Sequence, residues 1–157
     1  MQISENAGKF YINGEWVEPS TSDTLDVVNP ATEEVIGTIA LGGQADVDAA
    51  VAAAQAAFES WSQTSVDERL AVLNKVTELI AARGEDLAAV ISAEMGAPIS
   101  MSREAQADCG IGHLEGFIDA LESQQSREVL PNGDTLVREP IGVCGLITPW
   151  NWPINQI

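Results

Sequence analysis

The stretch IGVCGLITPWNWPINQI, residues 141–157, decides the fold class that this sequence predicts. It begins with a short apolar run, VCGLI at 143–147, which ends just before Pro149. Such a run is typical of a strand that is buried on both faces, as in a parallel sheet covered by helices. Pro153 suits the first turn of a following helix, where an N–H group has no intrahelical partner. The sequence therefore predicts an α/β fold in which residues 148–152 form a strand-to-helix loop.

Asn151 lies in this loop between two tryptophans, Trp150 and Trp152. In open α/β sheets, ligands bind at the loops that follow the carboxyl ends of strands. An asparagine amide is a neutral donor, and in a site that two indoles keep dry and rigid it can stabilise an oxyanion. The same pattern is also typical of an ordinary turn asparagine flanked by packing aromatics. The residues alone leave both interpretations open.

The composition indicates a globular chain without a basic surface. The 157 residues are 45% hydrophobic and carry a net charge of −17. With only seven lysines and arginines, the chain cannot assemble a basic patch, which argues against nucleic acid and anionic membranes as partners. No stretch approaches the ~20 apolar residues of a membrane span, and no secretory signal is evident. Two cysteines are too few for a disulfide framework, so we expect a cytoplasmic protein.

Hairpins and helices are predicted upstream of the decisive stretch. Asn13-Gly14 between two short apolar arms predicts a hairpin over residues 10–17, because both turn residues tolerate positive φ. Apolar periodicity and capping residues predict the other elements: strands at 25–28 and 35–40, helices at 46–61, from Ser65 to Gly84, at 85–95 and at 100–123, and a hairpin at 127–140.

The predicted helix over 100–123 carries a stripe of small residues that includes Gly112 and Gly116. We expect this helix to be mostly buried, with another backbone close to the small stripe. An acidic helical interaction module, which docks a partner helix on this stripe without catalysis, is therefore the alternative function. That alternative leaves PWNWP, residues 149–153, without a purpose.

Three further side chains are candidates for chemistry. His113 has no second histidine or cysteine at ligand spacing, so a packing or hydrogen-bonding role is predicted and no metal site. Cys109 is expected to be a small core residue. Cys144 is expected to lie inside the apolar strand, without a cation that would lower its thiol pKa. A small hydrolase that uses His113 and a cysteine lacks a convincing triad.

EPIGVCGLITPWNWPI, residues 139–154, resembles the segment of the aldehyde dehydrogenase superfamily that enters the nucleotide-binding domain. The upstream order is similar too, with FYINGEWV at 10–17, VNPATEEVIG at 28–37, DVDAAVAAAQAAFESW at 46–61 and EMGAPI at 94–99. The resemblance implies an aldehyde dehydrogenase-like α/β fold, in which amino-terminal hairpins and helices end at the first strand of a parallel Rossmann-like sheet.

The resemblance also divides the chain into three parts. Residues 1–126 would form the amino-terminal hairpins and the helical part of the cofactor domain. Residues 127–140 would form a hairpin of the bridging region, which helps to join subunits into a homodimer or homotetramer. Residues 141–157 would be the incomplete start of the NAD(P)-binding domain. Because a strand that is apolar on both faces needs neighbours, we expect the chain to be the amino-terminal fragment of a longer enzyme, inactive alone and binding NAD⁺ weakly or not at all.

The implied activity is the oxidation of an aldehyde to a carboxylic acid with NAD or NADP through a cysteine thiohemiacetal. By resemblance, Asn151 is the catalytic oxyanion donor, and the cofactor site is lined by Ile147, Thr148, Pro149 and Trp150. Trp152 stands where phenylalanine is commonest in the family, a departure that leaves this assignment standing. The family's nucleophilic cysteine and general-base glutamate lie downstream of the motif, outside this sequence. The identity of the aldehyde and the choice between NAD and NADP stay open.

Overall fold

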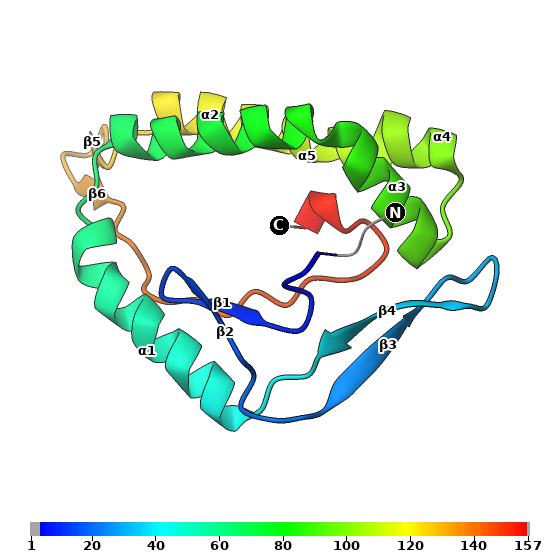
Figure 1. Cartoon of the computed structure of the whole chain (residues 1–157). Coiled ribbons are helices and arrows are strands. Elements are labelled where there is room, and N and C mark those ends of the chain that lie inside the picture. The colour runs from blue at the N-terminus through cyan, green and yellow to red at the C-terminus, as the bar shows by residue number, and fades with distance from the viewer. Residues whose placement is uncertain (1–3, 157) are drawn as a thin grey trace.

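The computed structural model describes residues 4–156. Two helices, α2 (Val66–Ala82) and α5 (Asp108–Ser123), lie side by side in one layer, with two hairpins below them in the view of Figure 1. Helix α1 (Gln44–Trp61) runs along one side, and α3 (Gly84–Met95) lies at the other end. The last segment of the chain runs below the helical layer toward the middle of the molecule (Figure 1).

The strands of the described chain form three separate antiparallel hairpins. They are β1 (Phe10–Ile12) with β2 (Glu15–Val17), β3 (Thr24–Val28) with β4 (Val35–Ala40), and β5 (Arg127–Val129) with β6 (Thr135–Val137). Asn13 has φ 54° and Gly14 has φ 82°, the left-handed conformation that a two-residue hairpin turn requires. The predicted Asn-Gly hairpin is confirmed.

The predicted helices are also confirmed, with one irregularity. Ser65 caps α2, because its hydroxyl accepts from the Glu68 N–H at 3.2 Å and the Glu68 carboxylate accepts from the Ser65 N–H at 2.7 Å. The irregularity lies in the last long helical stretch, which consists of α4 (Ile99–Met101), a π-helical segment η1 (Ser102–Ala107) and α5. A short 3₁₀ turn, η2 (Ile154–Gln156), follows near the end of the chain.

The best-buried residues lie where α3 meets the π-helical segment. They are Ala88, Ile91, Ala97, Ser102, Gln106 and Ala107. Two members of this group are polar, although buried polar side chains normally need hydrogen-bond partners. The loss of a hydrogen bond at this junction would therefore lower the stability of the fold more than a loss at the surface.

The expectation that the helix over 100–123 is mostly buried is wrong for its α5 part. Within α5 only Gly110 is buried, and Phe117 is 70% exposed. Gly112 and Gly116 have no atom of another element close enough to touch an added Cβ. A π-helical turn inserts one residue relative to an α-helix and so rotates the following positions by about 100°. A uniform helical wheel therefore misplaces the close approach, which occurs at Gly110.

The predicted buried strand at residues 143–147 is not formed in the described chain. These residues belong to no helix or sheet, and Leu146 and Ile147 are 81% and 99% exposed. A strand depends on a neighbour that takes up its N–H and C=O groups, and no described strand pairs with this segment. The α/β class with its hairpins and helices is confirmed, whereas its terminal strand has no partner here.

The surface area is large for the size of the chain. It is 11162 Å², whereas a compact folded monomer of this mass exposes roughly 7,600 Å² by the usual scaling of area with mass. Some of the most exposed large apolar side chains lie in the last segment, where Ile141 is 92% and Trp150 is 79% exposed. No helix of residues 4–156 combines the length and the apolar character that a membrane crossing requires.

Candidate functional site

The five predicted site residues are consecutive and form one open loop before the η2 turn. They are Ile147, Thr148, Pro149, Trp150 and Asn151, and all five are exposed. The expectation that Trp150 and Trp152 together keep Asn151 dry is wrong for this chain, because only Trp152 is partly buried. The reason is that the segment before the loop pairs with no strand of residues 4–156.

Asn151 is nevertheless attached to the helical layer through its main chain. The side-chain amide of Gln106 donates from Nε2 to the Asn151 carbonyl oxygen at 3.2 Å. Gln106 is 1% exposed, so this hydrogen bond starts from the core of the molecule. Within residues 4–156 no hydrogen bond is made by the Asn151 side chain. Its amide NH₂ is therefore available to a ligand.

Two further contacts attach the η2 turn to the same helical stretch. A Cβ added at Gly110 would lie 2.2 Å from Ile154 Cγ2, so this glycine is what allows the isoleucine to approach. One turn further along, His113 donates from Nε2 to Asn155 Oδ1. Residues 106, 110 and 113 follow the helical spacing of one face and hold successive parts of the last segment.

The π-helical segment explains why Gln106 belongs to this set. Ser102, Gln106 and Ala107 are buried together, whereas Glu104 between them is exposed. Single π-helical turns inside α-helices occur frequently at functional sites, because they re-aim side chains without ending the helix. Neither Gln106 nor Gly110 is among the residues that the sequence predicts for the site. Gly110 could have been noticed as a third glycine of the helix, but a π-helical turn has no simple sequence signal.

The other candidates for chemistry are placed as follows. His113 has the predicted hydrogen-bonding role, with Asn155 as its partner. The Cys109 thiol donates to the Gln106 carbonyl at 3.1 Å, and burial raises its pKa, so the thiol is protonated at neutral pH. Cys144 is exposed and not buried as expected, because the strand around it is unpaired. Within residues 4–156 no three histidine, cysteine or acidic side chains converge as metal ligands.

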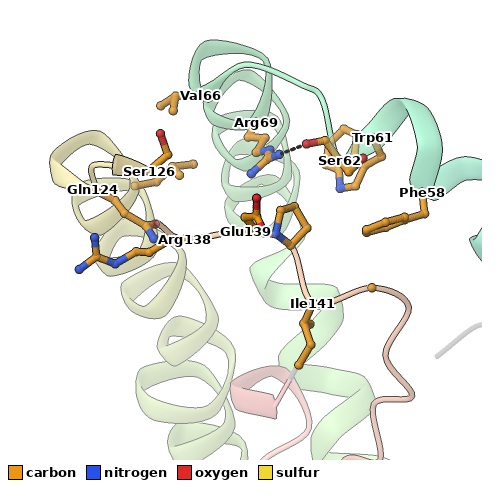
Figure 2. Close-up of a pocket in the computed structure, with 13 residues that line it drawn as sticks. Phe58, Trp61, Ser62, Val66, Arg69, Gln124, Ser126, Arg138, Glu139 and Ile141 are labelled. Carbon is orange, nitrogen blue, oxygen red and sulfur yellow. Dashed lines mark hydrogen bonds between the residues drawn. The ribbon is translucent and has the colours of Figure 1, made fainter. Parts of the chain in front are cut away.

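A separate cavity of about 450 Å³ lies between the α1–α2 turn, the end of α5 and residues 138–142 (Figure 2). The Arg69 guanidinium at its wall donates to the Ser62 carbonyl at 3.3 Å, and Arg138 donates to the Gln125 carbonyl at 2.9 Å. Both cationic groups therefore already have protein partners. None of residues 147–151 lines this cavity, so it is not part of the Asn151 loop.

Comparison with known proteins places the loop inside a long match. The family model described as aldehyde dehydrogenase family matches residues 16–157. The chain is 46% identical over 151 residues to 3-succinoylsemialdehyde-pyridine dehydrogenase of Pseudomonas sp, a match that covers 95% of this chain and 31% of that protein. The chain therefore spans about a third of the length of this curated relative.

Solved structures give the same result for the fold. A mutant of aldehyde dehydrogenase C from Pseudomonas syringae, complexed with NAD⁺ and octanal, superposes with a TM-score of 0.94 at 48% identity, covering 99% of this chain and 32% of that chain. An aldehyde dehydrogenase from Mycobacterium tuberculosis, complexed with NAD⁺, superposes with a TM-score of 0.86 at 36% identity, covering 95% of this chain and 32% of that chain. The predicted fold relationship is confirmed.

Proposed function

The chain belongs to the aldehyde dehydrogenase family, and on that premise we propose that it is the amino-terminal part of an enzyme that oxidises an aldehyde to a carboxylic acid with NAD⁺ or NADP⁺. The observation that carries the proposal is the family match from residue 16 to residue 157, because it includes the Asn151 loop. The match covers 31% of the named relative, so the activity is proposed for a longer polypeptide that contains this chain.

Asn151 is proposed to stabilise the oxyanion that forms when a nucleophile attacks the aldehyde carbon. Its amide is neutral at every relevant pH, so it donates without competing for the proton that the reaction moves. The side chain is exposed and makes no hydrogen bond within residues 4–156, while its main chain is attached to a buried residue. A side-chain donor that makes no other hydrogen bond, on a main chain that is held in place, suits this role.

The cysteine nucleophile is proposed to come from outside residues 1–157. Cys109 is unsuited because burial keeps its thiol protonated. Cys144 has only a weak contact to the Gly142 carbonyl at 3.8 Å, and no cation or histidine bonds to it in the described chain. Neither thiol therefore has the electropositive surroundings that make a reactive thiolate.

The residues before Asn151 fit a nicotinamide cofactor. Ile147 and Trp150 present open apolar faces at 99% and 79% exposure, and the main chain of 147–150 makes no hydrogen bond within the described residues. Cofactor sites are lined mainly by apolar side chains, with a few polar groups such as backbone N–H and C=O that orient the ligand. When bound, NAD⁺ or NADP⁺ would supply the acceptor for the hydride that leaves the aldehyde carbon. Thr148 and Pro149 complete the proposed cofactor-lining set.

The domain assignment is part of the same proposal. Residues 1–126 would form hairpins and the helical part of the cofactor domain, and residues 141–157 the start of its sheet. The hairpin within 127–140 would join subunits into a homodimer or homotetramer. It is suited to this because all six residues of β5 and β6 are exposed and the two strands pair only with each other in the described chain.

Replacement of Asn151 by alanine in the complete protein tests the proposal. Octanal and a pyridine semialdehyde are suitable aldehydes, each assayed by NADH or NADPH formation. We expect Asn151→Ala to lower kcat and kcat/KM together by roughly 10²- to 10³-fold, because the donor acts only in the transition state. Asn74→Ala is the matched control, since Asn74 lies on α2 and donates only to the Leu70 carbonyl. Wild-type kcat in Asn151→Ala would refute the role.

A further inference from the structure

Gln106 is a buried glutamine whose amide has a defined orientation. Its Nε2 lies 3.2 Å from the Asn151 carbonyl oxygen and 3.7 Å from Met95 Sδ. A carbonyl oxygen only accepts hydrogen bonds, so the amide atom that faces it must be the NH₂ group and not the oxygen. The side chain is 1% exposed, so water does not reach this donor.

The other end of the same amide is unsatisfied. Gln106 Oε1 is buried without a hydrogen-bond partner among the described residues, and so is Ser102 Oγ one helical turn earlier. An unsatisfied buried acceptor lowers stability, and an apolar side chain of similar length would avoid this cost. Stability alone therefore does not account for a glutamine here, whereas donation to Asn151 does.

The bond from Gln106 is the contact that reaches the proposed oxyanion donor itself. The contacts made by Gly110 and His113 fix Ile154 and Asn155, which lie after the loop. Residues 147–150 before it are exposed and unpaired within the described chain. Asn151 would therefore depend on Gln106 for its main-chain position on the helical layer.

From this geometry we infer that Gln106 is a positioning residue, which holds Asn151 where its side-chain amide meets the developing oxyanion. This inference rests on the proposed function. Catalytic donors must stay within a fraction of an ångström of their place, and a displacement of about 1 Å costs on the order of 10²-fold in rate. Loss of the Nε2 donor therefore affects catalysis more than folding.

Gln106→Met in the complete protein is the primary test, because methionine keeps the length and removes the donor. We expect kcat to fall roughly 10- to 100-fold, with the KM for aldehyde changed less than about twofold and the melting temperature unchanged or raised. Gln55→Met, on an exposed position of α1, is the matched control and should keep wild-type kcat. A fall in melting temperature together with an unchanged kcat would overturn the inference.

A double-mutant cycle separates positioning from general disturbance. If Gln106 acts through Asn151, Gln106→Met should lower kcat no further in the Asn151→Ala background. An equal loss in both backgrounds would overturn the inference. Gln106→Glu gives a second readout, because a buried glutamate donates only when protonated, so its kcat relative to wild type should rise as pH falls. A pH-independent ratio would also overturn it.

These outcomes are distinguishable from failure of the proposed function. If wild-type protein oxidises no aldehyde with NAD⁺ or NADP⁺, or if Asn151→Ala has wild-type kcat, then the proposed function fails and the positioning role fails with it. If Asn151→Ala is slow and Gln106→Met is not, only the role of Gln106 fails.

Discussion

Replacement of Gly110 by alanine should detach the end of the chain from the helix that holds it. The added methyl group would lie 2.2 Å from Ile154 Cγ2, 3.5 Å from Ile154 Cβ and 3.6 Å from the Ile154 carbonyl oxygen. Carbon atoms in contact normally stand about 3.5–4.0 Å apart, so more than about 1 Å of movement is needed. The clashing methyl belongs to a β-branched side chain that rotates with difficulty. The turn itself must therefore move.

The size of the effect follows from two opposing contributions. Overpacking of this kind typically costs about 1–3 kcal/mol. Alanine in place of glycine inside a helix returns about 1 kcal/mol through helix propensity. Gly116→Ala is the matched control on the same helix, because nothing lies within 4 Å of a Cβ added there. The gain in helix propensity is the same in both variants. The difference in stability between them, about 1–3 kcal/mol, therefore measures the clash alone.

Amide hydrogen exchange in the complete protein reads this difference at the η2 turn. The Asn155 N–H donates to the Trp152 carbonyl at 3.1 Å and reports whether the turn is docked. A difference of 1–3 kcal/mol corresponds to roughly 5- to 150-fold faster exchange in Gly110→Ala than in Gly116→Ala. Equal protection of Asn155 in the two variants would show that the turn does not rest on Gly110 and would refute the reasoning.

Two further predictions concern Asp46 at the start of α1 and Val129 in the β5–β6 hairpin. Hydrogen bonds lower the pKa of Asp46, chiefly the one from the Ser20 hydroxyl and secondly the one from the Gly43 N–H. The carboxylate therefore stabilises the fold above its unfolded pKa of about 3.9, and this stabilisation is lost as the pH falls through the lower folded pKa. The melting temperature of Asp46→Asn should therefore depend less on pH than that of wild type, over roughly pH 5 to 3, where this carboxylate begins to lose its charge. The same change of melting temperature with pH in both proteins would contradict this. Val129, in β5, is 71% exposed, and Val129→Asp should convert the proposed oligomer into smaller species in sedimentation experiments, whereas an unchanged mass would remove β5 from the interface.

The elements predicted correctly from the sequence are those whose causes are local. Asn13 and Gly14 adopt positive φ within one turn, and Ser65 and Glu68 cap their helix across four residues. Neither motif needs information from elsewhere in the chain. The family relationship was also predictable, because the segment around Asn151 is specific and the upstream motifs occur in the same order.

The predictions that failed depend on distant parts of the molecule. Burial of residues 143–147 requires neighbouring strands, and apolar character alone cannot supply them. Docking of Asn151 on Gln106 joins residues 45 positions apart in the chain. It also depends on the π-helical turn, which changes the helical face on which residues after 107 lie. A helical wheel with 3.6 residues per turn throughout places those residues on a different face.

The Asn151 loop is attached to the helical layer on one side and exposed on the other. On one side the buried Gln106 holds the main chain of Asn151. Gly110 and His113 contact Ile154 and Asn155 of the η2 turn that follows. On the other side the Asn151 amide and the apolar faces of Ile147 and Trp150 remain open. Packing of further protein against the open side would remove water there, which strengthens a hydrogen bond to a developing charge. It would not have to move the attached side, so the helical layer can fix the position of the donor before the open side of the site is covered.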